Sequence, residues 1–458
     1  MKTKVPHLPR MPIIGNLHQI AGKDILGRFI EACQGFYPVT ELDVLGRKLL
    51  MITSVDLAKE VFDETHYDKF IDQPLFYIRK MAGDGLFTAW TDEPNWGKAH
   101  NILLPGFANK AIAGYIPLMQ KTIDELIDKW KKQPNNIDVG EDMTRLTFET
   151  IGLCGFDFSF ESFKSETRHP FVEAMLFTFT EAIQLSRTLP FMKPFRFKRN
   201  KQFKDYIEYM NNVLDDIIRK RRAEPEKYTD KIDFLQLMLH ATDKETGEGL
   251  SDENIRYQIV TFLIAGHETT GGLLSFAIYN LLNHPEALKL AYQEVDEVLG
   301  TDKTKEISQA DFKNLKYLRQ VLMESLRLFP PVLAFTRYSK EDRMIGEEGY
   351  PVKANQCIFI FSYYLHRDKK HWGENPEAFD PGHFTAEAIA NRDRDAFKAF
   401  GHGQRVCMGQ HFAMLEATLA LAKILQNFEM TLNAGYKMEL VESLTMKPKG
   451  MKISVLER

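Results

Sequence analysis

An uninterrupted apolar-rich run from Ser251 to Asn283 sets the strongest limit on the fold of this chain. Ser251 can cap a helix, and Asp252 and Glu253 are well placed in its first turn. About 33 residues at roughly 1.5 Å each give a helix roughly 50 Å long. Such a helix must cross a whole domain, and its middle is apolar nearly all round, as expected for burial. We therefore predict a large α-rich fold organised around this helix.

Small and polar residues stand at the middle of the run, in the segment AGHETTGG at 265–272. Glycine weakens a helix, and a buried acid or alcohol needs a hydrogen-bond partner, so these residues are costly there. One interpretation is a packing notch for a crossing helix. The other is a functional groove, which we favour because Gly266, Glu268 and Thr269 bring a glycine, an acid and an alcohol together.

Helical periodicity dominates the rest of the chain, and β-type patterns appear towards both ends. The pattern VTELDVLGRKLLMIT predicts strands joined by a turn at Gly46. We expect a mainly α fold with small β-sheets, built as one domain over residues 1–458. Its expected parts are an N-terminal β-rich part at about 38–60, an α-rich body at about 61–330 and 400–430, and C-terminal β elements at about 331–362 and 433–458.

The charge balance bears on the classes of partner. Charged residues make up 27% of the chain, and the net charge is only −4. This balance argues against nucleic acid, or an anionic membrane, as the main partner. Prolines interrupt the first residues, and no stretch reaches the roughly 18 apolar residues that span a bilayer. We expect a cytoplasmic protein with no membrane anchor.

The segment FGHGQRVCMG, from Phe400 to Gly409, carries the strongest chemical signal. It fits the pattern F-x-x-G-x-R-x-C-x-G at every fixed position. Glycines let a backbone turn closely beneath a flat ligand, and Arg405 offers a fork for a carboxylate. A helical run follows Cys407, so the helix N-terminus favours a thiolate there. No CxxC or Cys/His cluster includes the remaining cysteines, which we expect to be buried and reduced: Cys33, Cys154 and Cys357.

A second pattern lies on a helix predicted from about Phe312 to Phe329. Its segment ESLR puts Glu324 and Arg327 on one face, where the two side chains can pair. Alone, such a pair is very common and usually lies on the surface. This one stands on an otherwise apolar helix, about 80 residues before Cys407.

These patterns together resemble the cytochrome P-450 superfamily. The resemblance implies the fold of that superfamily, with a long central helix crossing over the haem, and Cys407 as the axial ligand to the iron of haem b. Thiolate ligation favours cleavage of the oxygen–oxygen bond. Glu324 and Arg327 resemble the superfamily's buried structural pair. In the segment PGHF, His383 stands where most members carry an arginine that completes this network, and histidine is shorter and titrates near neutrality.

The resemblance also implies roles for the long helix. Thr269 would donate a hydrogen bond to bound dioxygen or its water network, and Glu268 would help to relay protons. A threonine can also bond back to the carbonyl four residues earlier, here Ala265. Members that use peroxide directly usually lack this acid–alcohol pair. Its presence favours dioxygen activation with electrons supplied by a reductase.

Four segments sharpen the resemblance to one bacterial branch: AGDGLFTAW, HNILLPGF, EDMTRLTFETIGLCGF and ENIRYQIVTFLIAGHETT. They are similar to the self-sufficient flavocytochromes, fatty-acid hydroxylases whose haem domain is fused to a diflavin reductase. The similarity extends from about residue 10 to the end and is weakest around 185–200. We expect either the haem domain of a longer protein or a stand-alone relative, with no reductase domain in this chain and with FMN, FAD and NADPH on a fused or separate diflavin reductase.

The branch implies residues around the cofactor and the substrate. The cofactor residues would be Lys69, Phe87, Trp96, His100, Ala265, Phe400 and Arg405. The substrate residues would be Arg47, Met51, Leu75, Ile78, Ala82, Phe87, Phe179, Ile264, Val332, Ala334 and Leu444. For most of the apolar ones, plain core packing competes with this interpretation. Met51 replaces a tyrosine of the branch and cannot donate a hydrogen bond to a carboxylate, and Val332 replaces an alanine.

The leading hypothesis is therefore a monooxygenase that uses dioxygen to hydroxylate medium- or long-chain fatty acids near the methyl end. A second hypothesis keeps the mechanism but takes another apolar substrate. A third is a non-catalytic haem sensor or lipid-binding protein. Glu268 and Thr269 argue against the third, because neither is needed to hold haem.

Overall fold

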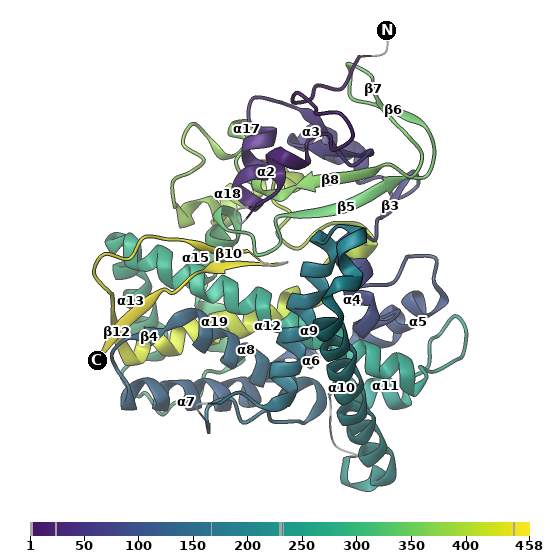
Figure 1. The fold of residues 1–458 in the computed structure, drawn as a ribbon. Helices are drawn as coiled ribbons and strands as arrows, with labels where there is room; N and C mark the ends of the chain where they lie inside the picture. The colour runs from purple at the N-terminus through teal and green to yellow at the C-terminus, as the bar shows by residue number, and fades with distance from the viewer. Residues whose placement is uncertain (1–2, 23–24, 166, 229–230, 232, 443–444) are drawn as a thin grey trace. The chain divides into compact units, whose positions relative to one another are not determined.

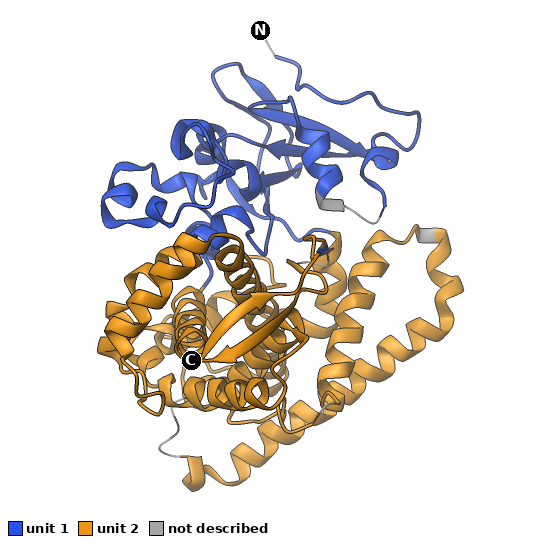
Figure 2. Ribbon diagram, turned by 90° about the vertical axis from the view of Figure 1, so that its left-hand side faces the viewer, with its two compact units in different colours: residues 1–72, 323–407, 440–446 blue, residues 73–322, 408–439, 447–458 orange. Residues whose placement is uncertain are grey.

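A computed structural model of the chain describes residues 3–22, 25–165, 167–228, 231, 233–442 and 445–458. The described elements are mainly helices with small sheets, as the sequence predicts (Figure 1). The chain divides into two compact units (Figure 2). Unit 1 comprises residues 1–72, 323–407 and 440–446, and unit 2 comprises residues 73–322, 408–439 and 447–458. The expectation of one domain over the whole chain stays a prediction.

Unit 1 is built on a five-stranded sheet whose strands come from both ends of the chain, in the order β1-β2-β8-β5-β3. Its strands are β1 (Val39–Val44), β2 (Arg47–Ile52), β3 (Tyr67–Lys69), β5 (Ala334–Ser339) and β8 (Cys357–Phe361). Leu45 and Gly46 have positive φ angles of 55° and 84°, which make the predicted tight turn between β1 and β2. One face of the sheet packs on a core that includes Val39, Leu50 and Ile358.

Short elements complete unit 1. They are α1 (Leu17–Ile20), α2 (Ile25–Cys33), α3 (Val55–Val61), α16 (Ser362–Leu365), α17 (Lys369–Trp372), α18 (Ala386–Asn391), β6 (Arg343–Ile345), β7 (Tyr350–Val352) and β10 (Leu440–Glu442). Single turns of 3₁₀ helix lie at η4 (Pro381–Phe384), η5 (Arg394–Ala396) and η6 (Gly403–Arg405). The core cluster continues to Trp372 and Phe384, so these segments are packed rather than loose loops.

Unit 2 is a helical body. Its helices are α4 (Gln73–Ala82), α5 (Pro94–Leu103), α6 (Asn109–Ala113), α7 (Ile116–Lys132), α8 (Val139–Phe156), α9 (Pro170–Arg187), α10 (Phe197–Ala223), α11 (Phe234–His240), α12 (Asp252–Asn283), α13 (Pro285–Leu299), α14 (Gln309–Asn314) and α19 (Gln410–Asn427). The 3₁₀ segments are η1 (Leu104–Phe107), η2 (Pro190–Arg196) and η3 (Pro225–Tyr228). The antiparallel sheet β4-β12-β9 joins β4 (Ile137–Asp138), β12 (Lys452–Glu457) and β9 (Phe428–Leu432), and β11 spans Met446–Pro448.

The long helix is confirmed as α12, and Ser251 caps it by accepting a hydrogen bond from the Asn254 backbone N–H. It packs most extensively against α8. A methyl group on Gly266 would stand 3.3 Å from the Ile151 side chain, and one on Gly271 would stand 3.2 Å from the Met143 carbonyl oxygen. Gly266 and Gly271 therefore serve close packing against α8, as the notch interpretation predicts.

The prediction of one continuous helix from Phe312 to Phe329 is wrong. The chain forms two helices there, α14 and α15 (Lys316–Leu328). The chain leaves helical geometry at Leu315, where ψ is 66°. The Glu294 carboxylate of α13 accepts hydrogen bonds from the backbone N–H groups of Tyr317 at 2.6 Å and Leu318 at 2.9 Å. A side chain distant in sequence thus caps the start of α15, and no local pattern could reveal that.

Candidate functional site

Cys407 ends a tightly turned loop of unit 1 that begins at Phe400. Gly401 and Gly403 have φ angles of 79° and 69°, which side chains rarely allow. The Cys407 backbone N–H donates to the Phe400 carbonyl at 2.8 Å, so the loop closes on itself. Gly403 of the sequence motif and Gly401, at a variable position of it, are therefore needed to bring Cys407 round to the end of this loop.

Exposure separates Cys407 from the other cysteines. Cys33, Cys154 and Cys357 are buried, whereas Cys407 is exposed. Burial raises the pKa of Cys33 to about 12 and also raises those of Cys154 and Cys357, so these three stay protonated thiols. Of the four, Cys407 alone is exposed enough to take an external ligand as it stands.

Cationic side chains gather in unit 1. Lys69 on β3 stands opposite Arg337 on β5 in the strand register. Burial, and then the positive charge of Arg405, lower the pKa of Lys69 to about 7, although Asp72 and Asp68 act in the opposite direction. An anion placed here would relieve this repulsion. The donor set therefore fits a carboxylate-bearing ligand.

Arg337 belongs to this cluster, and the sequence analysis missed it. Its Nη2 donates to the His402 carbonyl at 3.2 Å and lies 3.5 Å from a Glu64 carboxylate oxygen. Its buried Nη1 has no hydrogen-bond partner in the described part of the chain. A buried, unsatisfied guanidinium nitrogen calls for an acceptor. The sequence did offer one signal, an arginine inside the short strand segment FTRYS, where burial of its charge costs desolvation free energy.

The middle of α12 presents one open face in unit 2. Ala265 is exposed, and Gly266 and Thr269 are half-buried, although residues on both sides of them are buried. The Thr269 hydroxyl donates to the Ala265 carbonyl at 2.8 Å, as predicted. A short exposed strip within a buried helix fits a flat apolar group laid against it. Gly271 packs against α8, Gly266 takes part in both the packing and the strip, and the functional interpretation of AGHETTGG stays a prediction.

Acidic and basic side chains flank this strip. Glu268 is buried, and its charge partly offsets the effect of burial, which lowers the pKa of the neighbouring His267. His267 Nδ1 lies 2.5 Å from the Leu263 carbonyl, and its Nε2 has no hydrogen-bond partner among the residues described. An acid and a neutral imidazole therefore adjoin Thr269 along α12.

The remaining predicted cofactor residues of unit 2 lie on or near α5. Trp96 is buried and stacks on His100, with ring centroids 5.3 Å apart. Phe87 is half-buried in the segment that follows α4. Trp96 and His100 lie one turn apart on the same helix, so the sequence spacing alone accounts for their contact.

The predicted substrate residues of unit 2 come from helices that pack together. Helix α4 packs against α9 and against α12. The residues on these helices are all buried: Leu75, Ile78, Ala82, Phe179 and Ile264. The structure brings these helices together, and core packing accounts for their residues equally well.

Other predicted substrate residues are scattered over unit 1. Arg47 is exposed on β2, whereas Met51 on the same strand is fully buried and pairs with Phe359 of β8. Val332 is 39% exposed just before Ala334, the first residue of β5. Leu444 lies outside the described residues. Arg47 is therefore open to a charged substrate group, and Met51 acts as a core residue.

The pair Glu324 and Arg327 on α15 is fully buried within unit 1. Arg327 Nε and Nη2 donate to the two Glu324 carboxylate oxygens at 2.8 and 2.6 Å. Arg327 also donates to three backbone carbonyls, those of His366, Pro376 and Ala378. Every donor direction of this guanidinium is used, so it ties α15 to the chain between 366 and 378.

His383 does contact this network, which the sequence left in doubt. Its Nδ1 lies 3.2 Å from a Glu324 oxygen. Arg392 donates to the His383 carbonyl at 2.8 Å and lies 3.9 Å from the centroid of the Trp372 ring. Burial lowers the pKa of Arg392 to about 10, while the charge of Glu324 raises it. Arg392 thus supplies a positive charge close to Glu324 and His383.

We expect the stability of the protein to depend on pH because of His366, which lies beside the same network. Burial, and then the charge of Arg367, lower its pKa to about 3, against about 6.5 when unfolded. Its stabilisation is complete above about pH 6.5 and is lost as the pH falls towards 3. Between about pH 6.5 and 5, chemical denaturation should show that this group lowers the free energy of unfolding by up to about 1.4 kcal/mol per pH unit. His366→Gln should remove this contribution, because the variant takes up about one proton fewer on unfolding in this pH range. Equal slopes in the two proteins would contradict the assignment.

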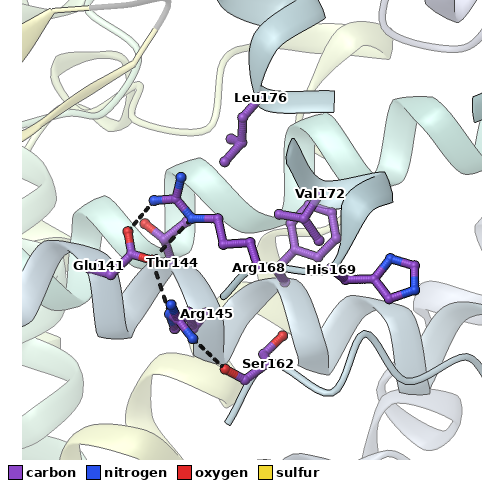
Figure 3. Close-up of a pocket in the computed structure, with 9 residues that line it drawn as sticks. Glu141, Thr144, Arg145, Ser162, Arg168, His169, Val172 and Leu176 are labelled. Carbon is purple, nitrogen blue, oxygen red and sulfur yellow. Dashed lines mark hydrogen bonds and ion pairs between the residues drawn. The ribbon is translucent and has the colours of Figure 1, made fainter. Parts of the chain in front are cut away.

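Two pockets in unit 2 contain none of the predicted site residues. Figure 3 shows the first, between α8 and α9, where Arg145 and Arg168 both contact Glu141. Burial alone would raise the pKa of Glu141, but these arginines hold it below its usual value. The second is apolar, with Phe156, Phe171 and Leu263 among its walls. The first pocket is thus a structural ion-pair cluster.

Comparison with known proteins bears on the family of this chain. The family model for cytochrome P-450 matches residues 6–455. The chain is 46% identical over 456 residues to a bifunctional cytochrome P-450/NADPH–P-450 reductase 2 of Bacillus subtilis, covering 99% of this chain and 41% of the relative. It is 44% identical over 464 residues to a bifunctional cytochrome P-450/NADPH–P-450 reductase of Bacillus cereus, covering 100% and 43%.

A fungal relative extends the comparison. The chain is 37% identical over 461 residues to a self-sufficient cytochrome P-450 monooxygenase of Phanerodontia chrysosporium, covering 100% of this chain and 43% of the relative. The chain thus spans about two fifths of the length of these relatives. Among the described residues, no helix is both long and apolar enough to cross a membrane. The family resemblance drawn from the sequence is confirmed: the chain belongs to the cytochrome P-450 family.

Proposed function

We propose that this chain is the haem-binding, dioxygen-activating part of a monooxygenase that hydroxylates medium- or long-chain fatty acids near the methyl end. The observation that carries the proposal is Cys407, the exposed cysteine at the end of a glycine-turned loop, in a chain of the cytochrome P-450 family. Electrons would come from NADPH through FAD and FMN on a reductase. The three relatives compared above carry reductase or self-sufficient in their names, which supports a fused or separate reductase partner.

The residues of the chain fit haem b. Cys407 would ligate the iron, with Phe400 beside the sulfur. Lys69, Arg405 and Arg337 would bind its carboxylates, since all three are cations of unit 1 and the buried Nη1 of Arg337 lacks an acceptor among the described residues. Trp96 and His100 are the corresponding candidates in unit 2, and Phe87 would lie over the haem. Bound haem supplies the redox chemistry that no side chain of this protein provides.

Glu268 and Thr269 would manage protons on the open strip of α12. The Thr269 hydroxyl already donates to the Ala265 carbonyl, so its oxygen lone pairs remain able to accept a hydrogen bond from water. Glu268 is a titratable group next to it, and a carboxyl group can exchange protons with such a water. Burial lowers the pKa of His267 on the same turn, so this imidazole adds no positive charge beside Glu268.

Apolar burial would supply most of the substrate affinity. The candidates on α4, α9 and α12 are all apolar: Leu75, Ile78, Ala82, Phe179 and Ile264. Each methylene removed from water contributes roughly 0.8 kcal/mol. Arg47 would meet the fatty-acid carboxylate, and because it is exposed its attraction is modest and falls with salt. Val332 and Ala334 are further candidates from unit 1.

Titration with fatty acids of graded length, while the spin state of the iron is recorded, tests this function. We expect a spin-state shift whose half-saturation falls about fourfold for each added methylene until the site is full. Arg47→Ala should weaken binding by no more than about fivefold at low salt and less at high salt. Lys48→Ala, on the adjacent exposed residue of β2, is the matched control and should leave binding unchanged. No shift with any fatty acid would refute the substrate and leave the haem assignment intact.

A second candidate is a monooxygenase for an uncharged apolar substrate. It is favoured by Met51, because its thioether has no hydrogen-bond donor and its side chain is fully buried, so it cannot help Arg47 to bind a carboxylate. Long-chain alcohols would then shift the spin state as strongly as the acids of equal length, and Arg47→Ala would change neither titration.

A further inference from the structure

The segment between α4 and α5, which carries Phe87, lies directly against α12 within unit 2. A methyl group on Gly83 would stand 2.2 Å from the Tyr257 ring, and one on Gly85 would stand 2.3 Å from the Thr261 hydroxyl oxygen. Real side-chain carbons do not come so close, so a residue larger than glycine fits neither position. The two glycines therefore let this backbone lie on the surface of α12.

A chain of hydrogen bonds fastens the same segment to α12. The Gln258 side-chain oxygen accepts from the Leu86 backbone N–H at 3.0 Å, and its Nε2 donates to the Asn254 side-chain oxygen at 3.0 Å. Asn254 Nδ2 then donates to one Asp84 carboxylate oxygen at 2.8 Å, and Asn95 of α5 donates to the other at 2.7 Å. Because Asp84 and Leu86 belong to one segment, the chain of bonds closes into a ring. We call Asp84, Leu86, Asn254 and Gln258 the amide latch.

The groups at the two ends of the amide latch fix its direction. A backbone N–H can only donate and a carboxylate can only accept, so the two amides between them have one orientation that satisfies both ends. Asn254 is 2% exposed and Gln258 is fully buried, so neither amide can exchange these hydrogen bonds for bonds to water. Because an unsatisfied buried polar group is costly, the latch holds the segment in one position.

Phe87 follows directly after Leu86, whose backbone N–H the latch binds. On its other side, the Thr88 hydroxyl donates to the Gly83 carbonyl at 2.8 Å, and Arg79 donates to the Thr88 carbonyl at 2.9 Å. Hydrogen bonds therefore hold both neighbours of Phe87, and they fix the backbone from which its ring projects.

We propose that the amide latch positions Phe87, and that Gln258 and Asn254 thereby help to decide which part of a substrate reaches the iron. The proposal rests on the proposed function, because it takes Phe87 as the residue over the haem. Gln258 and Asn254 are positioning residues, since they act on the substrate through Phe87. Leucine at position 258 would fill a similar volume on the buried face of α12 but would release the segment.

Binding of imidazole and of the bulkier 4-phenylimidazole to the haem-loaded chain tests the proposal. Both ligands bind iron through a nitrogen atom, so neither needs to resemble the natural substrate. Phe87→Ala is the reference, and it should change the ratio of the two dissociation constants at least about tenfold in favour of the bulkier ligand. Gln258→Leu should change the ratio in the same direction by at least about threefold.

Gln120→Leu is the matched control. Gln120 is also a buried glutamine of unit 2, and it accepts from the Ile307 backbone N–H at 2.7 Å and donates to the Ile307 carbonyl at 3.1 Å. Its replacement leaves a buried N–H without an acceptor but should not change the ligand ratio. Asp84→Leu, at a half-buried position, should shift the ratio as Gln258→Leu does. Asp84→Asn should keep it, because an amide oxygen still accepts from Asn254.

Hydrogen exchange at the Leu86 backbone N–H measures the latch itself, with no ligand present. We expect exchange at least about fivefold faster in Gln258→Leu than in the unmodified chain. An unchanged exchange rate would show that the latch does not hold the segment. Faster exchange with an unchanged ligand ratio, or an equal change of ratio in Gln120→Leu, would leave the latch a purely structural role and overturn the proposal.

The same measurements separate this proposal from the proposed function. If Phe87→Ala does not change the ligand ratio, Phe87 does not lie over the haem, and the proposal fails with that placement. If fatty acids do not shift the spin state but the ligand ratios change as expected, the fatty-acid substrate is refuted and the role of the latch stands.

Discussion

Replacing Cys407 with histidine is expected to abolish the thiolate-type Soret band of the reduced, carbon monoxide-bound protein and to produce the band of histidine-ligated haem. The physical reason is that the remaining cysteines are buried and their thiol pKa values are raised, so none can replace the lost thiolate. The effect is complete rather than partial, because the ligand determines the electronic structure of the iron. The measurement is the reduced, carbon monoxide-bound difference spectrum.

Cys33→Ala is the matched control for this experiment. Cys33 is also a free cysteine of unit 1, but it is only 1% exposed. We expect Cys33→Ala to keep the thiolate-type band at full intensity. A thiolate-type band that survives Cys407→Ala as well would exclude Cys407 as the ligand.

Replacing Arg327 with methionine should destabilise the protein by about 3–5 kcal/mol, because it leaves the buried Glu324 carboxylate without its main counter-charge. Three backbone carbonyls lose their donor at the same time. His383 and the Asp380 backbone N–H still contact Glu324, so the loss need not be total. Denaturant unfolding of the haem-loaded protein measures the change in the free energy of unfolding.

An exposed pair of the same spacing provides the control. Glu161 and Lys164 are also three residues apart, with their charged atoms 3.3 Å apart and both side chains 62% exposed. Lys164→Met should cost less than about 1 kcal/mol. The double variant Glu324→Leu/Arg327→Met should be more stable than Arg327→Met alone, since it removes the stranded carboxylate. If Arg327→Met lowers the free energy of unfolding by no more than Lys164→Met does, the buried network does not stabilise the fold.

Sequence patterns predicted the elements whose causes are local. Helix α12 begins at its Ser251 cap and ends before Pro285, and the turn at Gly46 lies where glycine was needed. The spacing of Glu324 and Arg327 also fixed their contact, because three residues along a helix return to one face. Family membership followed from the same kind of short-range evidence around Cys407.

Contacts between distant residues were beyond prediction. Arg337 joins Lys69 through strand register, and Arg392 joins the network of Glu324 from a separate segment. Neither residue stands in a recognisable motif. The ion pairs of Arg196 and Arg199 depend in the same way on Glu181 of α9. Sequence alone cannot say which way an arginine points, because that depends on where its carboxylate is folded.

The carboxylate of Glu294 at the start of α15 has a geometric consequence for the buried network. Each residue of an α-helix turns the chain by about 100°, so the residue at which a helix starts fixes the direction of every side chain after it. By holding the N–H groups of Tyr317 and Leu318, Glu294 sets the rotational phase of α15. Had α14 continued unbroken through Leu315, Glu324 and Arg327 would emerge at a different azimuth. One side chain of α13 thus aims an ion pair two turns away.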